Sequence, residues 1–579
     1  MPLDFRNTNS LWASVLVETL VRLGLQTAVI SPGSRSTPLT MALATHLDVD
    51  AVPILDERSA AFFGLGVAKR TGWPVVLVCT SGTAGANYYP AVIEARESRV
   101  PLLVLTADRP PELRDCASGQ TIDQQKLFGD FPNWYAELAS PLPELTMLRY
   151  LRQTLTQAWN RALFPTAGPV HLNCPFRDPL PPLPDGSAAH LEGLLDESFF
   201  SGIHPRQPAS RTVASSESIE PVQNTWTGCD RGLIVAGPAQ PTDPEAYCQA
   251  VAALSRHLNW PVLAEGLSPL RNHAGLIPNL VSTYDTILRQ PQWSEELAVE
   301  QVIQLGPLPT SKVLRQWLDQ TSPQRWVLDA GVSNLDPLHG ATTHLPFSVE
   351  QLAPSLAEAQ PSPSAYSETW RLLEPKVRHY LDSTFSDMKD IFDGKVPWMM
   401  ARHLPQETPV MIANSLPIRD VEWFWPPSNG RIRPFCNRGA NGIDGTLSTA
   451  LGIAHRGQPT AFLTGDLALL HDTNGWLSLP RLQGHLTVIL INNHGGGIFE
   501  MLPVAKFDPP FEDFFATPQT VDFNHLCAAY GVNYERVQSW KQLQACLSFL
   551  PERGVRVLEV RCDRKQSQRI RQKLLNLNP

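Results

Sequence analysis

Short runs of apolar and β-branched residues recur along this chain, and each is followed by a stretch with the apolar spacing of a helix. A strand that is apolar at every position is buried on both faces, as happens where helices cover both sides of a parallel sheet. In the outer thirds these runs are residues 27–30, 75–79, 102–106, 410–413, 460–464 and 487–491. Shorter candidates in the middle third are residues 232–235, 262–264, 302–305 and 326–328. The sequence therefore predicts an α/β protein with mainly parallel sheets.

The length of 579 residues requires more than one such sheet, because a single hydrophobic core stops growing at roughly 250–300 residues. Two segments rich in proline and serine, residues 178–227 and 352–367, are typical of linkers. They predict three consecutive α/β domains, which we expect at residues 1–180, 181–360 and 361–579.

Charge and cysteine content exclude several classes of protein. Lys and Arg number 47 against 56 Asp and Glu, a net charge of −9 without a long basic run, so we expect no nucleic-acid partner. No window reaches the roughly 18 consecutive apolar residues of a membrane span. The nine cysteines contain no Cys-x-x-Cys pair, which favours a reducing compartment over a disulfide framework or a zinc site.

The N-terminal region contains an apolar stretch, residues 11–23, that Glu18 and Arg22 interrupt and Gly24 ends. This pattern favours a surface helix over a signal peptide. We therefore expect a cytoplasmic protein whose ligands are small molecules.

The two outer segments share a local pattern. Residues 65–84 and 451–468 both read Leu-Gly-β-branched-Ala-x-Arg, followed by a Gly-x-Pro turn, an apolar strand and a threonine near the strand end. Either any helix–turn–strand unit looks like this, or one α/β domain has been duplicated. In the second case the copies carry different strand ends, Ser81-Gly82-Thr83 in one and Gly465-Asp466 in the other.

Two polar residues at strand ends predict a metal site. Asp466 follows the strand expected at 460–464, and Asn493 follows the strand expected at 487–491. If these strands are neighbours, a carboxylate and an amide oxygen converge, which suits Mg²⁺ with further ligands from carbonyls, waters and phosphates. Gly495, Gly496 and Gly497 allow the backbone to approach a diphosphate closely.

On these residues the chain resembles thiamin-diphosphate enzymes, whose signature is Gly-Asp-x followed by Asn-Asn. Gly465-Asp466-Leu467 and Asn492-Asn493 match it. The resemblance implies a pyrimidine-binding, a central Rossmann-like and a diphosphate-binding domain, with Mg²⁺, or Mn²⁺ in its place, held by Asp466, Asn493 and Gly495. It also implies a homo-oligomer, a dimer or a dimer of dimers, with the cofactor at a subunit interface.

The superfamily needs one glutamate beside the pyrimidine N1′ atom, and Glu57 matches it. Glu57 follows an apolar run in "LDERSAAFFGLG", where a strand gives way to an apolar helix. A carboxyl group can exchange this proton near neutral pH only if an apolar setting raises its pKa. Read without the resemblance, Asp56-Glu57-Arg58 is a charged helix start.

Longer motifs in both outer segments are similar to the 2-succinyl-5-enolpyruvyl-6-hydroxy-3-cyclohexene-1-carboxylate (SEPHCHC) synthase family. They are "SPGSRSTPL" from Ser31, "DERSA" from Asp56, "TSGTA" from Thr80, "ADRPPEL" from Ala107 and "NRGANGIDG" from Asn437. The resemblance implies decarboxylation of 2-oxoglutarate and conjugate addition of the remaining unit to isochorismate, in menaquinone or phylloquinone biosynthesis.

The family resemblance also assigns site residues. Cofactor contacts are expected from Glu57, Thr80, Ser81, Gly82, Ile443, Gly465, Asp466, Leu467, Asn493, Gly495, Gly496, Ile498 and Phe499. Substrate contacts are expected from Ser34, Arg35, Arg109, Gln120, Lys312, Ser415, Arg419 and Arg438. Both substrates are dicarboxylates, for which guanidinium groups are the fitting partners. The chain departs from the family pattern at Gly119, before Gln120, where others carry asparagine, and at Val313, where a second basic residue can follow Lys312.

Two other functions are alternatives to the SEPHCHC synthase reaction. A different thiamin-diphosphate 2-oxoacid decarboxylase, or an acetolactate-type synthase, predicts fewer arginines in the site. A nicotinamide dehydrogenase, or a non-catalytic nucleotide-binding protein, requires a Gly-x-Gly-x-x-Gly turn after a strand. Gly64-x-Gly66 is followed by Lys69 where the third glycine belongs, and it lies in a helical pattern before the strand.

Overall fold

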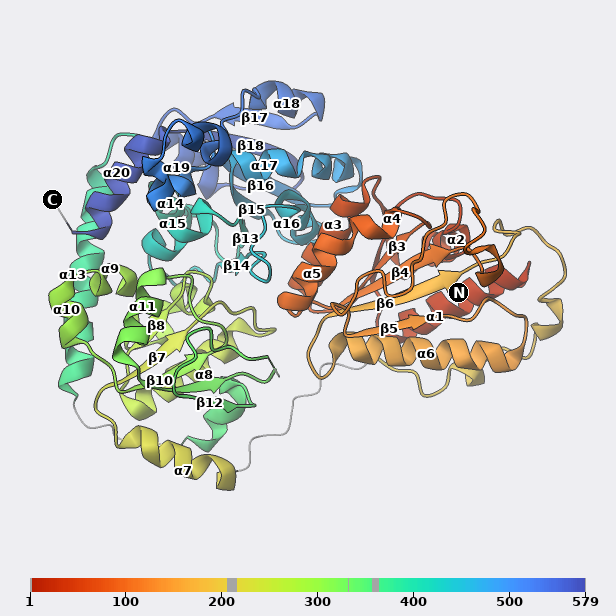
Figure 1. Ribbon diagram of the computed structural model, residues 1–579, viewed down its shortest axis with the longest axis horizontal. Helices are drawn as coiled ribbons and strands as arrows, with labels where there is room; N and C mark the ends of the chain where they lie inside the picture. Colours follow the sequence, from red (N-terminus) through yellow and green to blue (C-terminus); the bar gives the residue numbers. More distant parts are fainter. Residues whose placement is uncertain (1–2, 206–215, 332, 357–363, 578–579) are drawn as a thin grey trace. The chain divides into compact units, whose positions relative to one another are not determined.

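The structure is a computed structural model that describes residues 3–205, 216–331, 333–356 and 364–577 (Figure 1). The chain forms two compact units. The first comprises residues 1–209, 437–457 and 470–485, and the second comprises residues 210–436, 458–469 and 486–579. Residues 206–215 and 357–363, within the two expected linkers, lie outside the described residues.

Three six-stranded, all-parallel sheets confirm the predicted fold class. The first sheet contains β1 (Thr27–Ile30), β2 (Asp50–Pro53), β3 (Val75–Cys79), β4 (Leu102–Asp108), β5 (Trp134–Glu137) and β6 (Pro169–Pro175). The second contains β7 (Gly232–Ala236), β8 (Val262–Ala264), β9 (Leu280–Val281), β10 (Gln301–Leu305), β11 (Gln324–Leu328) and β12 (Thr342–Leu345). The third contains β13 (Pro409–Ile412), β14 (Arg433–Phe435), β15 (Thr460–Gly465), β16 (His485–Asn492), β17 (Asn533–Arg536) and β18 (Gly554–Arg561).

The first and third sheets have the same strand order. It is β2-β1-β3-β4-β6-β5 in the first and β14-β13-β15-β16-β18-β17 in the third, so each strand has its counterpart in the same place. Duplication of one α/β domain predicts this identity. The second sheet has the order β12-β11-β10-β7-β8-β9, which is the order of a Rossmann fold.

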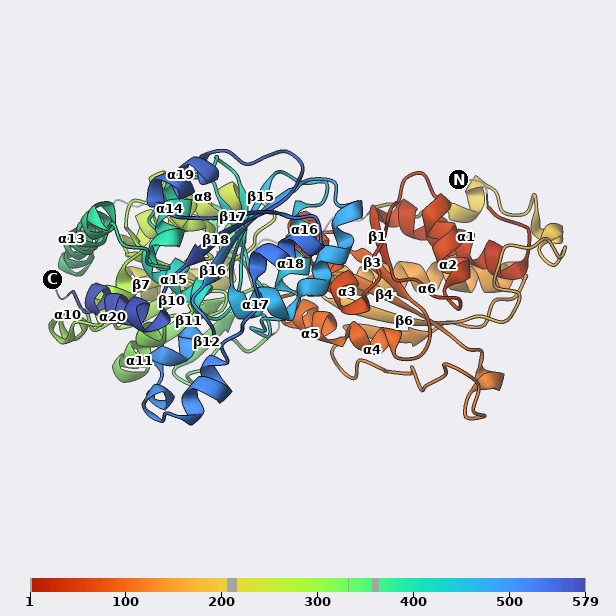
Figure 2. The same cartoon turned by 90° about the horizontal axis from the view of Figure 1, so that it is seen from above.

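Helices cover both faces of the first sheet, which explains its fully apolar strands. Helices α1 (Thr8–Leu23) and α6 (Leu145–Leu163) pack with Val76 and Val78 on one face. On the other face Gly64 of α3 (Glu57–Thr71) lies against Val75 and Leu77. In Figure 2 the strands run between α1 on one side and α5 (Tyr89–Glu97) on the other.

Glycines allow α3 to touch α16 (Thr446–Ala454) backbone to backbone within the first unit. A Cβ at Gly66 would lie 2.1 Å from the carbonyl oxygen of Thr449, and one at Gly452 would lie 2.0 Å from that of Phe63. Gly66, weighed above as part of a dinucleotide turn, therefore serves helix packing.

In the second unit, one hydrophobic core spans the second and third sheets, and buried ion pairs hold the helices around it. A common core includes α13 (Ala365–Asp387), α14 (Lys395–His403) and α15 (Leu416–Phe424). Arg571 of α20 (Arg564–Leu575) donates to Asp420 of α15 at 2.7 and 2.8 Å. Arg271 pairs with Glu422 at 3.3 Å, and all four of these side chains are buried.

The N-terminal helix differs from the expectation. We predicted a surface helix, but α1 is buried on nearly every side. The charge of Glu18 does not prevent burial, because its carboxylate pairs with Arg22 at 2.7 Å and with His46 at 3.2 Å. No helix in the described ranges is long and apolar enough to cross a membrane.

The described part of the first expected linker also packs against the first unit. Leu191, Phe199 and Phe200 are buried in its core. The proline-rich composition therefore does not correspond to an unpacked linker in this segment. The domain boundaries that we expected at residues 180 and 360 stay predictions.

Candidate active site

The loops after β1 and β3 meet at the carboxyl edge of the first sheet. Arg35 is 7% exposed, and its backbone N–H donates to Oγ1 of Thr80 at 3.3 Å. Its Nη1 donates to the carbonyl of Phe176 at 2.9 Å, and Asp178 lies 3.6 Å away. Among the described residues the buried Nε of Arg35 has no acceptor. Arg35 is thus held at the edge of the sheet, and its Nε–H remains able to donate a hydrogen bond.

Arg109 and Gln120 join the same cluster through Ser81. Nη1 of Arg109 donates to Oγ of Ser81 at 3.1 Å, and Nη2 donates to the carbonyl of Gly119 at 2.9 Å. Gln120 and Ser81 exchange two hydrogen bonds of 3.0 Å. Gly82, next to Ser81, has φ +85° and faces Gln120. The structure therefore brings together Arg35, Thr80, Ser81, Gly82, Arg109 and Gln120, while Ser34 is exposed on the first loop.

The two arginines of this cluster repel one another. Burial and the nearby charge of Arg109 together lower the pKa of Arg35. A bound carboxylate would relieve both effects, because it supplies an acceptor and the opposite charge.

A second ring of polar residues supports this cluster and was missed in the sequence. Asp108 is fully buried and accepts from Arg114 at 3.0 Å and from Asn173 at 2.9 Å. Oε1 of Gln124 accepts from the N–H of Gly82 at 2.8 Å. The carboxylate of Asp108 pairs with the guanidinium of Arg114, and from Arg109 it accepts the backbone N–H at 2.7 Å. Asp108 lies in the motif "ADRPPEL" without its role being inferred from it, and Gln124 and Asn173 bond to residues 42 and 65 positions away.

Glu57 begins α3 just after β2, as predicted. Asp56 caps the helix by accepting from the N–H of Ser59 at 2.8 Å. Glu57 is half-buried, and its charge contributes to the raised pKa of the Cys79 thiol at the end of β3. No hydrogen bond or ion pair occupies the Glu57 carboxylate in the described part of the chain, so it is available to a ligand.

The loop that carries Arg438 and Ile443 belongs to the first unit. Glu94 of α5, only 2% exposed, accepts from the N–H groups of Gly439 at 3.1 Å and of Ala440 at 2.8 Å. Arg438 and Ile443 are both half-buried on either side of this anchor. Glu94 is a second site-supporting residue that the sequence did not reveal.

In the second unit, β15 and β16 are paired neighbours, as the metal prediction required. Asp466 follows β15, and its Oδ2 accepts from the N–H of Gly495 at 2.8 Å. Burial raises the pKa of Asp466 to about 6, against the opposing effect of the Gly495 and Leu467 N–H groups. Asp466 forms no ion pair among the described residues, and a divalent cation would stabilise such a buried carboxylate. These residues therefore fit a metal ion bound with a diphosphate.

The glycines after Asn493 are required by close packing. Gly495 has φ +120°, and a Cβ there would lie 2.1 Å from the carbonyl of Ala516. A Cβ at Gly497 would lie 2.6 Å from Nδ2 of Asn493. Asn493 and Gly496 are buried, and the remaining predicted cofactor residues of this unit are half-buried, namely Gly465, Leu467, Ile498 and Phe499.

Two further contacts fix the strand end before this loop. Glu559 of β18 is fully buried and accepts from Nδ2 of Asn492 at 2.6 Å. Arg561 pairs with the same carboxylate at 2.8 Å. Glu559 thereby holds the residue next to Asn493.

Ser415 and Arg419 lie at the start of α15. Ser415 has φ 71° and ψ −128°, a backbone conformation in which strain concentrates at functional sites. Nη1 of Arg419 donates to the carbonyl of Ser415 at 2.5 Å. Lys312, the first residue of α11 (Lys312–Thr321), is exposed, and no described contact joins it to Ser415 or Arg419.

Comparison with protein families agrees with the three-sheet architecture. The model described as "Thiamine pyrophosphate enzyme, N-terminal TPP binding domain" matches residues 12–127. "Middle domain of thiamine pyrophosphate" matches residues 206–408. "Thiamine pyrophosphate enzyme, C-terminal TPP binding domain" matches residues 431–560. Thiamine pyrophosphate is another name for thiamin diphosphate.

Similar proteins of three organisms span nearly the whole chain. A protein of Trichormus variabilis named 2-succinyl-5-enolpyruvyl-6-hydroxy-3-cyclohexene-1-carboxylate synthase is 59% identical over 571 residues, 98% of this chain and 97% of the relative. Proteins of the same name from Nostoc sp. and Gloeothece citriformis are 58% and 57% identical, again over 98% of this chain and 97% of each relative.

Proposed function

Because the chain belongs to the SEPHCHC synthase family of thiamin-diphosphate enzymes, we propose that its site joins 2-oxoglutarate to isochorismate. The enzyme releases CO₂ from 2-oxoglutarate and adds the succinyl semialdehyde unit to isochorismate, a step of menaquinone or phylloquinone biosynthesis. The observation that carries this assignment is the pair Arg35 and Arg109. Their mutual repulsion and the free Nε of Arg35 suit a dicarboxylate better than a neutral substrate.

Thiamin diphosphate, when bound, supplies the electron sink for decarboxylation and carbon–carbon bond formation. Asp466, Asn493 and the carbonyl of Gly495 would hold Mg²⁺, or Mn²⁺ in its place, between the chain and the diphosphate. The buried Asp466 carboxylate, with its raised pKa and glycine cradle, supports this role. Thr80, Ser81, Gly82 and Ile443 of the first unit would line the rest of the cofactor, with Gly465, Leu467, Gly496, Ile498 and Phe499 of the second.

Glu57 would hold a proton at N1′ of the pyrimidine ring. Its carboxylate is half-buried and has no partner among the described residues, which supports an exchange of protons with a ligand. The other polar residues at the sheet edges would orient the substrates. Arginines and a lysine provide the carboxylate contacts (Arg35, Arg109, Arg419, Arg438 and Lys312), and uncharged side chains complete the pocket (Ser34, Gln120 and Ser415).

We place the complete site at the interface of a homodimer, which could itself pair into a tetramer. Large apolar side chains near the expected cofactor residues are exposed in the isolated chain. Leu55, two residues before Glu57, is 64% exposed, and Phe514, in the segment after the glycine loop, is 77% exposed. A partner subunit would cover such side chains. The nine cysteines, all unpaired, support the cytoplasm as the location.

One assay tests the reaction. The purified chain is incubated with thiamin diphosphate, Mg²⁺, 2-oxoglutarate and isochorismate, and the loss of isochorismate absorbance is followed. Pyruvate replaces 2-oxoglutarate in a parallel sample. Turnover of 2-oxoglutarate with isochorismate supports the proposal, whereas turnover of pyruvate alone would assign the chain to the acetolactate-type reaction.

A mixing experiment tests the shared site. Glu57→Gln and Asp466→Ala subunits, each inactive alone, should regain activity in hybrid dimers because one of the two sites then receives both intact halves. Native mass spectrometry confirms that the hybrids have formed. Hybrids without activity would show that each chain builds its own site.

A further inference from the structure

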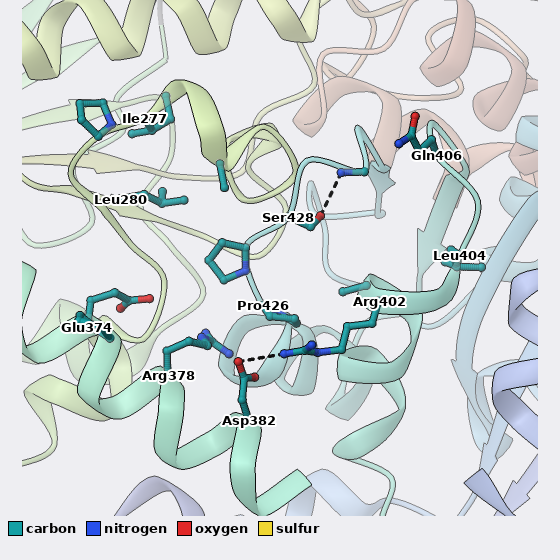
Figure 3. A pocket seen from close by; sticks show the side chains of 16 residues that line it. Ile277, Leu280, Glu374, Arg378, Asp382, Arg402, Leu404, Gln406, Pro426 and Ser428 are labelled. Atoms are coloured by element: carbon teal, nitrogen blue, oxygen red, sulfur yellow. Dashed lines mark hydrogen bonds and ion pairs between the residues drawn. The ribbon is translucent and has the colours of Figure 1, made fainter. Parts of the chain in front are cut away.

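A cavity of about 690 Å³ lies in the second unit (Figure 3). Its volume is within the range of small-molecule sites, roughly 300–1,000 Å³. It is lined by α13, by the end of α14 and by the loops around residues 274–280 and 426–430. None of the residues proposed above for cofactor or substrates lines it, so it is separate from that site.

Arg378 on α13 is the unusual residue of this cavity. Its Nη2 donates to Oγ of Ser282 at 2.9 Å. Its Nε and Nη1 are buried and have no acceptor within the described ranges of the chain. Burial lowers the pKa of the Arg378 guanidinium. Arg378 as a whole is half-buried, but leaving two buried donors of a cation without acceptors is costly, so these atoms call for an explanation.

The acidic residue one turn before Arg378 does not satisfy it. Glu374 lies at position i−4, where a carboxylate normally pairs with an arginine. Its carboxylate instead accepts from Oγ of Ser282 at 2.5 Å, and from the N–H and Oγ1 of Thr283 at 2.9 and 2.6 Å. Uncharged donors have therefore taken the oxygens that Arg378 would use.

The acidic residue one turn after Arg378 is also engaged elsewhere. Asp382, at position i+4, accepts from Nε1 of Trp398 at 2.7 Å and pairs with Arg402 at 2.9 Å. In Figure 3 Arg378, Asp382 and Arg402 lie together on one side of the cavity. Asp382 is paired with Arg402, so Arg378 feels its charge without donating a hydrogen bond to it, and the Nε and Nη1 of Arg378 still lack acceptors among the described residues.

The rest of the cavity wall is largely apolar, with Ile277, Leu280, Leu404 and Pro426 among its lining residues. We propose that this cavity binds a small organic carboxylate, with its acid group on Arg378 and its apolar body against these side chains. The negative charge of Glu374 remains nearby, so a simple probe should bind in the millimolar range. The proposal does not depend on the reaction catalysed at the other site.

Benzoate is a suitable probe, and its binding can be measured by saturation-transfer NMR on the full-length protein. Arg378→Gln should raise the Kd for benzoate at least about ten-fold. This is the effect of losing one charge-assisted hydrogen bond. The control is Arg371→Gln, because Arg371 is on the same helix but is exposed and pairs with Glu368. Benzyl alcohol tests the need for the acid group, and inorganic phosphate tests the need for the apolar body.

Loss of benzoate binding in Arg378→Gln but not in Arg371→Gln supports the site. Equal binding to both variants, or no binding of benzoate to the wild-type protein at millimolar concentration, overturns it. Phosphate binding as tight as that of benzoate would also overturn the organic ligand.

Thermal stability separates a ligand-binding arginine from a structural one. If Arg378 only stabilised the fold, Arg378→Met would lower the melting temperature. If Arg378 is kept with unsatisfied donors for a ligand, replacing its half-buried charge by an apolar side chain should leave the melting temperature equal or raise it. A clear fall in the melting temperature would contradict the proposal even if benzoate binding were lost.

Discussion

Arg564, the first residue of α20, connects the expected metal loop to two later segments. Its Nη1 donates to the carbonyl of His494 at 2.8 Å, and its Nε pairs with Glu500 at 2.6 Å. Its Nη2 pairs with Glu512. Although burial disfavours its charge, the hydrogen bonds to both carboxylates raise the pKa of Arg564. We predict that this one side chain keeps the loop around Asn493 ordered for cofactor binding.

The magnitude of this effect follows from the contacts. The Arg564 side chain is 10% exposed, and hydrogen bonds to charged groups contribute about 1.5–3 kcal/mol each. Arg564→Gln removes two ion pairs but can keep one hydrogen bond to a carbonyl. We therefore expect the ordered conformation of the loop to lose about 3 kcal/mol of stabilising free energy. If cofactor binding must then order the loop, the binding free energy weakens by the same amount, and the Kd for thiamin diphosphate with Mg²⁺ rises about 100-fold. Arg564→Lys should lie between, because an ammonium group cannot reproduce the planar fork.

Titration calorimetry of thiamin diphosphate in the presence of Mg²⁺ measures this effect. The matched control is Lys565→Gln, since Lys565 pairs with the same Glu512 at 3.1 Å but is 53% exposed. Exposed pairs contribute about 0–1 kcal/mol, so the Kd of this variant should change less than about five-fold. Equal Kd values for Arg564→Gln and Lys565→Gln would refute the role of Arg564 as an anchor.

Four other predictions concern single residues. Glu57→Gln should retain cofactor affinity while exchange of the thiazolium C2 proton, followed by NMR, slows by orders of magnitude; exchange at the wild-type rate would remove Glu57 from the mechanism. Arg109→Ala should raise the isochorismate KM roughly ten- to a hundred-fold and spare single-turnover decarboxylation of 2-oxoglutarate; equal loss of both steps with a lower melting temperature would point to a structural role. Gly119→Asn restores the family residue at a place where a Cβ meets nothing within 4 Å, so stability should change by less than about 0.5 kcal/mol and the isochorismate KM should fall; an unchanged KM would separate this position from the acceptor. Burial raises the pKa of Asp472 from 3.8 to about 7, so the folded chain holds a proton that the unfolded chain releases, and stability falls as the pH rises between these values by up to about 1.4 kcal/mol per unit. Asp472→Asn removes this loss, and its melting temperature relative to the wild type should rise from about pH 5 to about pH 8; a constant difference would mean that Asp472 does not titrate in this range.

Much of the fold could be predicted because strands that are buried on both faces are apolar at nearly every position. The runs 27–30, 75–79 and 262–264 coincide with β1, β3 and β8 to the residue. The metal hypothesis required β15 and β16 to be neighbours, and these two strands are paired in the sheet. Such features are local, or nearly so, and a single sequence displays them.

What could not be predicted depends on contacts between remote parts of the chain. Glu94 accepts hydrogen bonds from the N–H groups of Gly439 and Ala440, some 345 residues away. No sequence pattern near Glu94 predicts these bonds. Similarly, the pairing of Glu18 with His46 turned an expected surface helix into a buried one. Hydropathy records the cost of burying a charge but not the partner that offsets it.

The division of the chain into two interleaved units limits how the protein can be cut. Residues 437–457 and 470–485 fold with the first unit, although the sheet strands on either side of them belong to the second. A fragment ending near residue 205 would lack α16 and leave the glycine surface of α3, at Gly66, open to water. A fragment starting near residue 216 would carry α16 without the helix it packs against. Expression of single domains should therefore yield aggregation-prone pieces, and a separable first unit would need residues 437–457 and 470–485 grafted onto its end.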